Sequence, residues 1–82
     1  MSAKEMFEKR GFKYLESEIE IHVEKKDRQW GTKGIIDINF DLENKTIDFA
    51  FIGNESNFLP VYIDLEELQA INQQVTELGW YE

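Results

Sequence analysis

Few of the side chains that carry catalytic or metal-binding chemistry are present in this 82-residue sequence. There is one histidine, His22, and no cysteine, so a histidine pair for zinc, a thiolate nucleophile and a thiolate metal ligand are excluded. His22 stands between Ile21 and Val23, and this alternation places it on the outer side of an expected strand. We therefore interpret His22 as a solvated histidine among glutamates.

Three aspartates of the central region, Asp37, Asp41 and Asp48, are the remaining candidates for acid–base or metal chemistry. Asp37 and Asp41 are four residues apart on one expected strand, about 13 Å, whereas the paired carboxylates of glycosidases lie about 5 to 9.5 Å apart. That gap is also too wide for a single metal ion. Since no nucleophile, base and orienting group can be assembled, we predict no enzyme activity, no cofactor and no metal site.

The carboxylates of the expected strands form a more consistent pattern. They alternate with apolar residues, so they should share the sheet face that turns away from the helices. Such a face keeps a protein soluble and protects strand edges. A face of one sign also steers basic partners, so it could imitate DNA phosphates or dock a basic protein. The residues of this acidic face are Glu18, Glu20, Glu24, Asp37, Asp41 and Asp48.

The segment 25–34 differs in composition from the rest of the chain. It holds four of the nine basic residues, one tryptophan and two glycines, and we expect it to be a loop. Trp30 either packs back onto an open edge of the core or anchors a partner protein, and both interpretations stay open. The candidate contact residues of this segment are Trp30, Lys25, Lys26, Arg28 and Lys33.

The composition is that of one globular domain spanning residues 1–82, with 41% hydrophobic and 32% charged residues. Nine basic and seventeen acidic residues give a net charge of −8, which argues against direct binding to nucleic acid. No apolar run approaches the roughly 20 residues that span a bilayer, and no signal-peptide pattern opens the chain. Together with the absence of cysteine, this predicts a cytoplasmic protein without membrane contact.

Two helices are predicted, one at each end of the sequence. Each begins with a capping box, in which a short polar residue and a glutamate three positions later satisfy each other's backbone amides. Each ends at a glycine that can take the left-handed conformation. The boxes are Ser2 with Glu5 and Asp64 with Glu67, and the glycines are Gly11 and Gly79. The second helix should bury a stripe of Leu65, Leu68, Ile71, Val75 and Leu78.

Between the helices the apolar residues recur with a period of two, which predicts three strands and, near Val61 to Ile63, a short fourth strand. Parity and the repulsion between like charges favour a hairpin register in which Phe40 lies opposite Ile47 rather than Asp41 opposite Asp48. The fold class is therefore α+β. We expect two layers, with a helix, an antiparallel meander of three or possibly four strands and a second helix, and both helices on one sheet face.

Three stretches of the sequence carry a resemblance to known proteins. They are Ser2-Ala3-Lys4-Glu5-Met6-Phe7 with Gly11-Phe12, then Phe40-Asp41-Leu42-Glu43-Asn44-Lys45, and Leu65-Glu66-Glu67-Leu68-Gln69-Ala70-Ile71 ending in Leu78-Gly79-Trp80. The chain resembles small uncharacterised proteins encoded by phages and prophages of Gram-positive (Firmicute) bacteria. The resemblance implies a phage accessory protein and supplies no active site. We expect it to act by binding a host or phage protein, or alternatively as an acidic DNA mimic or nuclease inhibitor of the anti-restriction or anti-CRISPR type.

Overall fold

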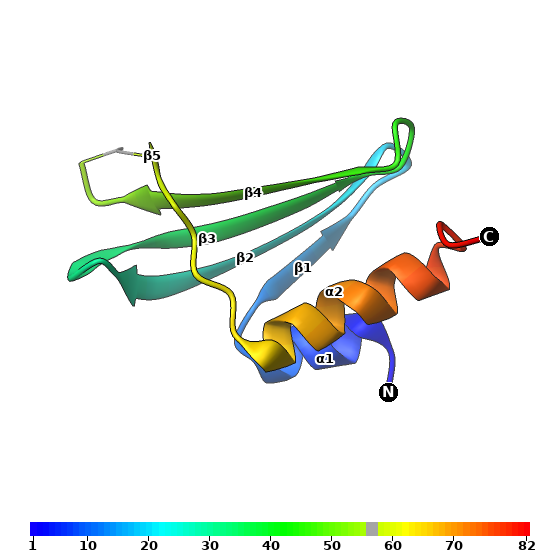
Figure 1. The fold of residues 1–82 in the computed structure, drawn as a ribbon, viewed down its shortest axis with the longest axis horizontal. Coiled ribbons are helices and arrows are strands. Elements are labelled where there is room, and N and C mark those ends of the chain that lie inside the picture. The colour runs from blue at the N-terminus through cyan, green and yellow to red at the C-terminus, as the bar shows by residue number, and fades with distance from the viewer. Residues whose placement is uncertain (56–57) are drawn as a thin grey trace.

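The computed structural model describes residues 1–55 and 58–82, and within them the chain forms two helices and one five-stranded antiparallel sheet (Figure 1). The strands follow one another across the sheet in the order β1-β2-β3-β4-β5, so the sheet is a meander. The elements are α1 (Ala3–Lys9), β1 (Lys13–Glu16), β2 (Glu20–Gln29), β3 (Thr32–Asp41), β4 (Thr46–Gly53), β5 (Phe58–Leu59) and α2 (Leu65–Glu77). The predicted α+β class is confirmed, with more strands than expected.

Two of the strands differ from the prediction. β1 was missed, because its four residues place Tyr14 on the helix side and show too short an alternation to stand out. The fourth strand was expected at 61–63, but the last strand is β5. Residues 61–63 form no strand because the side chain of Gln29 binds the main chain there: Gln29 Oε1 accepts from Tyr62 N at 2.8 Å, and Gln29 Nε2 donates to Tyr62 O at 2.9 Å.

The expected loop at 25–34 is instead the end of a long hairpin. β2 continues to Gln29 and β3 begins at Thr32, so only Trp30 and Gly31 form the turn. Both turn residues have positive φ, 56° and 70°, the combination of a two-residue turn that suits the twist of a hairpin. The prediction was wrong because tryptophan is an unusual residue at such a position and the charged residues around it hide the strand pattern.

The register between β3 and β4 is confirmed. Phe40 lies opposite Ile47, and Ile38 lies opposite Phe49. Asp41 therefore faces Thr46 and Asp48 faces Asn39, which avoids the direct pairing of two aspartates.

The predicted helix boundaries are also confirmed. Both capping boxes form, with Ser2 Oγ accepting from Glu5 N at 3.1 Å and Asp64 Oδ1 accepting from Glu67 N at 2.8 Å. Gly11 and Gly79 have φ of 90° and 72°. At these ends the amide of Phe12 donates to Phe7 O, and the amide of Trp80 donates to Val75 O, as in helix ends closed by a left-handed glycine.

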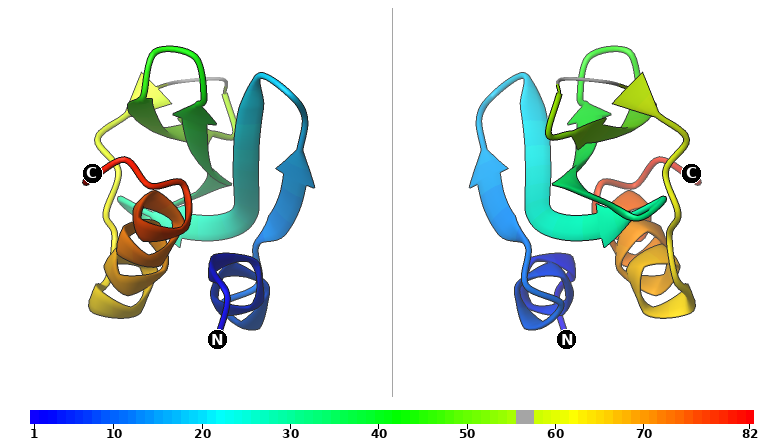
Figure 2. Two further views of the ribbon diagram at one scale, coloured as in Figure 1. Left: turned by 90° about the vertical axis from the view of Figure 1, so that its right-hand side faces the viewer. Right: turned by 90° about the vertical axis from the view of Figure 1, so that its left-hand side faces the viewer.

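The two helices lie side by side on the same side of the sheet (Figure 2). The ring of Phe40 on β3 lies 6.2 Å from the ring of Phe7 on α1 and 6.4 Å from the ring of Trp80 after α2. Phe40 is therefore the point where the sheet meets both ends of the chain. The buried cluster around it is Phe7, Phe12, Ile21, Val23, Ile36, Ile38, Phe40, Phe51, Ala70, Ile71 and Val75.

The buried side of α2 differs from the predicted stripe. Leu65 and Leu68 are 69% and 48% exposed, whereas Ile71 and Val75 are buried. α2 packs mainly against α1, and its contacts with the sheet include two polar side chains, Glu67 and Gln74, which are buried beside Ala70. Gln74 Oε1 accepts from the hydroxyl of Tyr14 at 2.7 Å, so these polar groups are satisfied where apolar ones were expected.

This arrangement lowers the stability loss expected for Leu68→Ala. The sequence predicts about 2 to 5 kcal/mol for a buried leucine, but a side chain that is half exposed should contribute only about 1 kcal/mol. The free energy of unfolding from urea denaturation measures the difference. A loss of about 2 kcal/mol or more would show that Leu68 is buried after all.

Candidate functional site

The sheet has an outer face, turned away from the helices, and the strand register orders its charges. Glu20 lies opposite Asp41, and Glu24 lies opposite Asp37, so carboxylates gather at one end of β2 and β3. At the other end, beside the Trp30-Gly31 turn, Arg28 lies opposite Lys33. The outer face therefore changes from negative to positive along the strands.

The residues predicted to form an acidic face are brought together only in part. Glu20, Glu24, Asp37, Asp41 and Asp48 all belong to strands β2, β3 or β4 and share the parity of the outer face. Glu18 instead lies in the turn between β1 and β2 and is exposed. The basic end of the same face was not foreseen, because the segment that carries it was interpreted as a loop.

His22 lies inside the acidic end. Its Nε2 is 2.5 Å from Asp37 Oδ1 and 3.8 Å from Glu24 Oε2, and its Nδ1 is 3.9 Å from Glu20 Oε2. The expectation that His22 points outward is confirmed, but it is half-buried rather than freely solvated. Partial burial raises the pKa of Asp37, while His22 acts to lower that pKa and the carboxylates of Glu24 and Glu20 raise it further.

Asp41 has a local structural role. Its carboxylate accepts hydrogen bonds from the amides of Asn44 and Glu43, both at 3.0 Å, and from the side chain of Asn44 at 2.9 Å. These donors, first of all the backbone and side chain of Asn44, hold the pKa of Asp41 below its ordinary value. The carboxylate thus fixes the turn between β3 and β4, in which Lys45 adopts a φ of 57°.

The lowered pKa of Asp41 has a predictable effect on stability. Since protonation is harder in the folded than in the unfolded chain, the stabilisation is present above the unfolded pKa and is lost as the pH falls through the folded pKa. We expect Asp41→Ala to lower the urea midpoint at neutral pH and the difference from the unchanged protein to shrink in acid. Asp48→Ala, on the same face, is the control. An Asp41→Ala difference that does not change with pH would contradict the assignment.

The basic end of the outer face surrounds a hollow. Lys26, Arg28 and Lys33 line a space of about 660 Å³ together with the side chains of Ile35 and Ile52. Arg28 Nη1 donates to Gly31 O at 3.2 Å, which holds the guanidinium at the turn. Among the residues that the structure describes, none of these three cations lies within ion-pair distance of a carboxylate. Three of the five predicted contact residues therefore meet at one hollow with an apolar floor.

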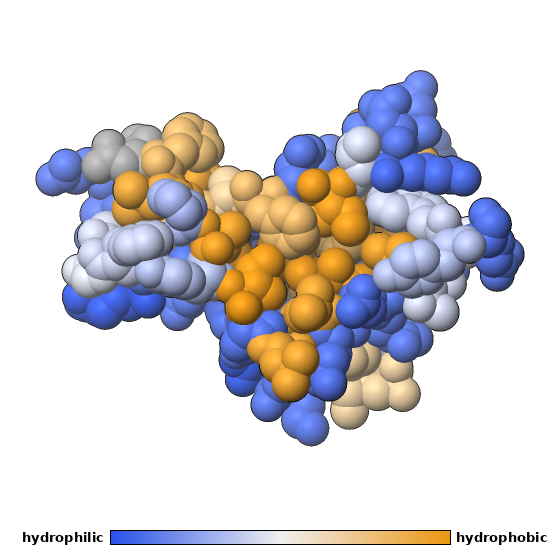
Figure 3. All heavy atoms as spheres, in the orientation of Figure 1, coloured by the Kyte–Doolittle hydropathy of each residue, from blue (hydrophilic) through white to orange (hydrophobic). Residues whose placement is uncertain are grey.

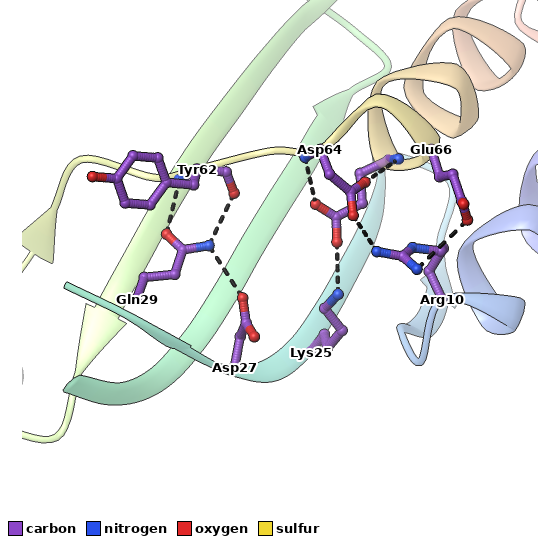
Figure 4. A network of polar contacts seen from close by, with 8 residues as sticks. Arg10, Lys25, Asp27, Gln29, Tyr62, Asp64 and Glu66 are labelled. Carbon is purple, nitrogen blue, oxygen red and sulfur yellow. Dashed lines mark hydrogen bonds and ion pairs between the residues drawn. The ribbon is translucent and has the colours of Figure 1, made fainter. Parts of the chain in front are cut away.

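Lys25 is placed elsewhere. It lies on the helix side of β2, where its Nζ is 2.6 Å from Glu67 Oε2 (Figure 4). The same Nζ lies 4.7 Å from the ring centre of Phe12. Both members of this ion pair are largely buried. Lys25 thus holds α2 to the sheet and lies apart from the other predicted contact residues.

Trp30 is both packed and exposed, so each of the two interpretations holds in part. Its ring stacks on Tyr62 with a centroid distance of 4.7 Å and an interplanar angle of 30°, and its Nε1 donates to Pro60 O at 2.7 Å. Gln29 ties the same segment to β2 through the main chain of Tyr62, and its Nε2 also reaches Asp27 (Figure 4). Even so, Trp30 and Tyr62 remain 53% and 54% exposed.

An apolar surface lies on the helix side of the molecule. Figure 3 shows apolar atoms gathered over the segment that leads into α2 and across the neighbouring face. Phe49 on β4, with Leu65 and Leu68 on α2, is among the exposed large apolar residues. The sequence predicts that Leu65 and Leu68 are buried, and this is wrong because periodicity reports the side of an element and not how much of that side a partner covers.

Comparison of the chain with protein-family models, with curated proteins and with solved structures finds no match. Of the described parts of the chain, neither α1 nor α2 is long and apolar enough to cross a lipid bilayer. The candidate site therefore has to be interpreted from its own geometry.

Proposed function

We propose that this protein is a non-enzymatic binding domain and that it contacts a host or phage protein through the end of the β2–β3 hairpin. One observation carries the proposal: Lys26, Arg28 and Lys33 line one hollow with an apolar floor, at the end of the hairpin whose turn carries the exposed Trp30. Tryptophan and arginine are the residue types that most often dominate the binding energy of protein interfaces.

The fixed position of Trp30 supports this role. The stacking on Tyr62 and the hydrogen bond to Pro60 hold the indole in one orientation while about half of its surface stays open. A side chain that is already ordered loses less conformational entropy on binding than a mobile one. Trp30 and Tyr62 therefore present a rigid aromatic surface that needs no rearrangement.

The chemistry of the hairpin end also indicates the chemistry of the partner. Three cations that meet no carboxylate among the described residues favour an acidic partner surface, and the floor of Ile35 and Ile52 favours an apolar side chain on that surface. The cations should mainly accelerate association, and this effect should weaken with salt. The aromatic pair should mainly slow dissociation.

The experiment compares variants in affinity capture from lysates of the host cells, with mass spectrometry to identify what is retained. We expect Trp30→Ala and the pair Arg28→Glu with Lys33→Glu to lose a partner that the unchanged protein retains. Tyr81→Ala is the matched control, because Tyr81 is an exposed aromatic residue next to the C-terminus, away from the end of the β2–β3 hairpin. Melting temperatures are measured for every variant. If Trp30→Ala lowers only the melting temperature and retains the partner, the proposed contact is wrong.

A second candidate is a DNA mimic or nuclease inhibitor that uses the acidic end of the outer face. The specific observation is that Glu20 faces Asp41 and Glu24 faces Asp37, since like charges directly opposite each other lower the stability of a sheet. A binding function for the clustered carboxylates would explain why the sheet carries them despite this loss of stability. Competition separates the two candidates: added duplex DNA should displace the target of a mimic, whereas a contact at the hairpin end should persist. The double variant Asp48→Asn with Glu20→Gln should weaken binding by a mimic and leave a contact at the hairpin end unchanged.

A phage accessory protein that acts in the cytoplasm is the biological setting that we propose for either candidate. The resemblance of the capping, turn and helix segments to phage and prophage proteins supports it, and so does a sequence without cysteine. Localisation of a fluorescent fusion during infection tests the setting. A fusion found at the cell surface would contradict it.

A further inference from the structure

We propose that His22, Glu24 and Asp37 together bind one divalent transition-metal ion of the zinc type. The ligand atoms of these three side chains all lie within 4.8 Å of one another. Two ligands of a single zinc ion lie at most about 4.4 Å apart, because zinc–nitrogen and zinc–oxygen distances are about 2.0 to 2.2 Å. Glu24 is the most exposed of the three, so a small rotation of its side chain closes the remaining gap.

The three ligands come from rigid neighbouring elements. His22 and Glu24 are two residues apart on β2 and therefore share the outer face, while Asp37 lies directly opposite Glu24 on β3. Both strands are central in the sheet and are paired on both sides. The spacing along one strand excluded a metal in the sequence analysis, whereas this site is formed across two strands.

The imidazole presents the correct nitrogen to the other ligands. Nε2 of His22 lies 2.5 Å from Asp37 Oδ1 and 3.8 Å from Glu24 Oε2, so both oxygens are on the same side of the ring. Nδ1 instead points toward Glu20 Oε2 at 3.9 Å. Metal-binding histidines commonly donate their second ring N–H to a carboxylate, which fixes the tautomer, and Glu20 is placed for that role.

One oxygen of the cluster also lacks a hydrogen-bond donor. Asp37 Oδ1 is fully buried and, although close to His22, makes no hydrogen bond within the described residues; Asn39 Oδ1, opposite His22, is in the same situation. In the same described part of the chain, the carboxylates of Glu20, Glu24 and Asp37 form no ion pair with lysine or arginine. A divalent cation would compensate both the negative charge and the unpaired oxygen.

The donor set favours one class of metal. Imidazole with carboxylates suits zinc and its neighbours among the first-row metals, whereas Mg²⁺ and Ca²⁺ prefer oxygen ligands alone. On binding, His22 Nε2 and Asp37 Oδ1 would separate to about 3.4 Å, the edge of a zinc tetrahedron. With three protein ligands on an open sheet face, water would occupy the fourth position.

Calorimetric titration of the untagged protein with Zn²⁺ tests the proposal. We expect one ion per chain, no displacement by excess Mg²⁺, and an affinity lower by about 100-fold or more in His22→Gln and Asp37→Asn. Glu20→Gln, which changes only the residue behind the imidazole, should weaken binding by about 10- to 100-fold. Asp48→Asn is the matched control, because Asp48 lies on the outer face but outside the cluster, and it should bind like the unchanged protein.

Nuclear magnetic resonance of the imidazole distinguishes binding at His22 from a diffuse attraction of ions to the acidic end. His22 is the only histidine, so its ring nitrogens can be followed by nuclear magnetic resonance without assignment of others. Zinc should shift the Nε2 resonance and leave Nδ1 protonated. Unselective binding of several ions, with equal losses in Asp48→Asn and Asp37→Asn and competition by Mg²⁺, would show only a diffuse attraction to the acidic end. That result, or an unchanged Nε2 resonance, overturns the proposal.

Discussion

Replacement of Phe40 by alanine is expected to lower the free energy of unfolding by about 3 to 5 kcal/mol, a large part of the 5 to 15 kcal/mol typical of a whole domain. Phe40 is fully buried and its ring lies between Phe7 of α1 and Trp80 after α2. Removing it leaves a cavity where the sheet and both ends of the chain meet. Urea denaturation, followed by tryptophan fluorescence, measures the loss.

Phe49→Ala is the matched control for this prediction. Phe49 lies on the same side of the sheet, but 43% of its surface is exposed because α2 does not cover it. Its replacement should lower the free energy of unfolding by no more than about 2 kcal/mol. Equal losses for the two phenylalanines would mean that the core does not centre on Phe40.

Glu67→Ala is expected to have a comparable effect, about 3 to 5 kcal/mol, because it leaves the charge of Lys25 largely buried and unpaired. Glu67 also accepts from the amide of Asp64 at 3.0 Å through its second carboxylate oxygen, so the start of α2 loses part of its capping box. Thermal and urea denaturation measure the loss.

Two comparisons test the cause of that loss. Glu66→Ala, one residue earlier, removes a carboxylate that is 68% exposed and 3.5 Å from Arg10, and should change the free energy of unfolding by less than about 1 kcal/mol (Figure 4). A double variant, Lys25→Met with Glu67→Met, removes both charges and should be more stable than Glu67→Ala alone. If the double variant is the less stable of the two, the unpaired charge is not the reason for the loss.

The features that sequence reasoning predicted correctly are those set by neighbouring residues or by parity. The helix ends depend on side chains within one turn, and Ser2 with Glu5 or Asp64 with Glu67 needs no distant partner. The register of β3 and β4 follows because a shift by one residue would turn every apolar side chain of the hairpin to the wrong face.

The features it missed depend on what covers a surface. The buried side of α2 includes Glu67 and Gln74 because Lys25 and Tyr14 happen to lie opposite them, and no local pattern announces such partners. Leu68 is predicted in the core for the opposite reason, since its helical spacing is correct but about half of its surface stays exposed.

For the candidate site, the sequence predicts several of the residues correctly but not the secondary structure that carries them. Lys26, Arg28 and Lys33 do gather at one hollow, and Trp30 lies in the adjoining turn, but these residues belong to a paired hairpin rather than a loop. The grouping of His22 with Glu24 and Asp37 could not be foreseen, because it requires the register between β2 and β3, and the sequence offered no parity argument for a hairpin that was taken to be a loop.

The contact between the two helices has a consequence for the order in which the chain can fold as the ribosome produces it. α1 is made first and α2 last, and the amide of Ala3 donates to the carboxylate of Glu77 at 2.8 Å. Each hairpin of the meander can pair as soon as its own strands have emerged, but the sides of α1 and Phe40 that α2 and Trp80 cover stay open to water until residues 65–80 arrive. The nascent chain therefore carries an uncovered apolar surface through most of its synthesis, which is the stage at which chaperones or premature association act.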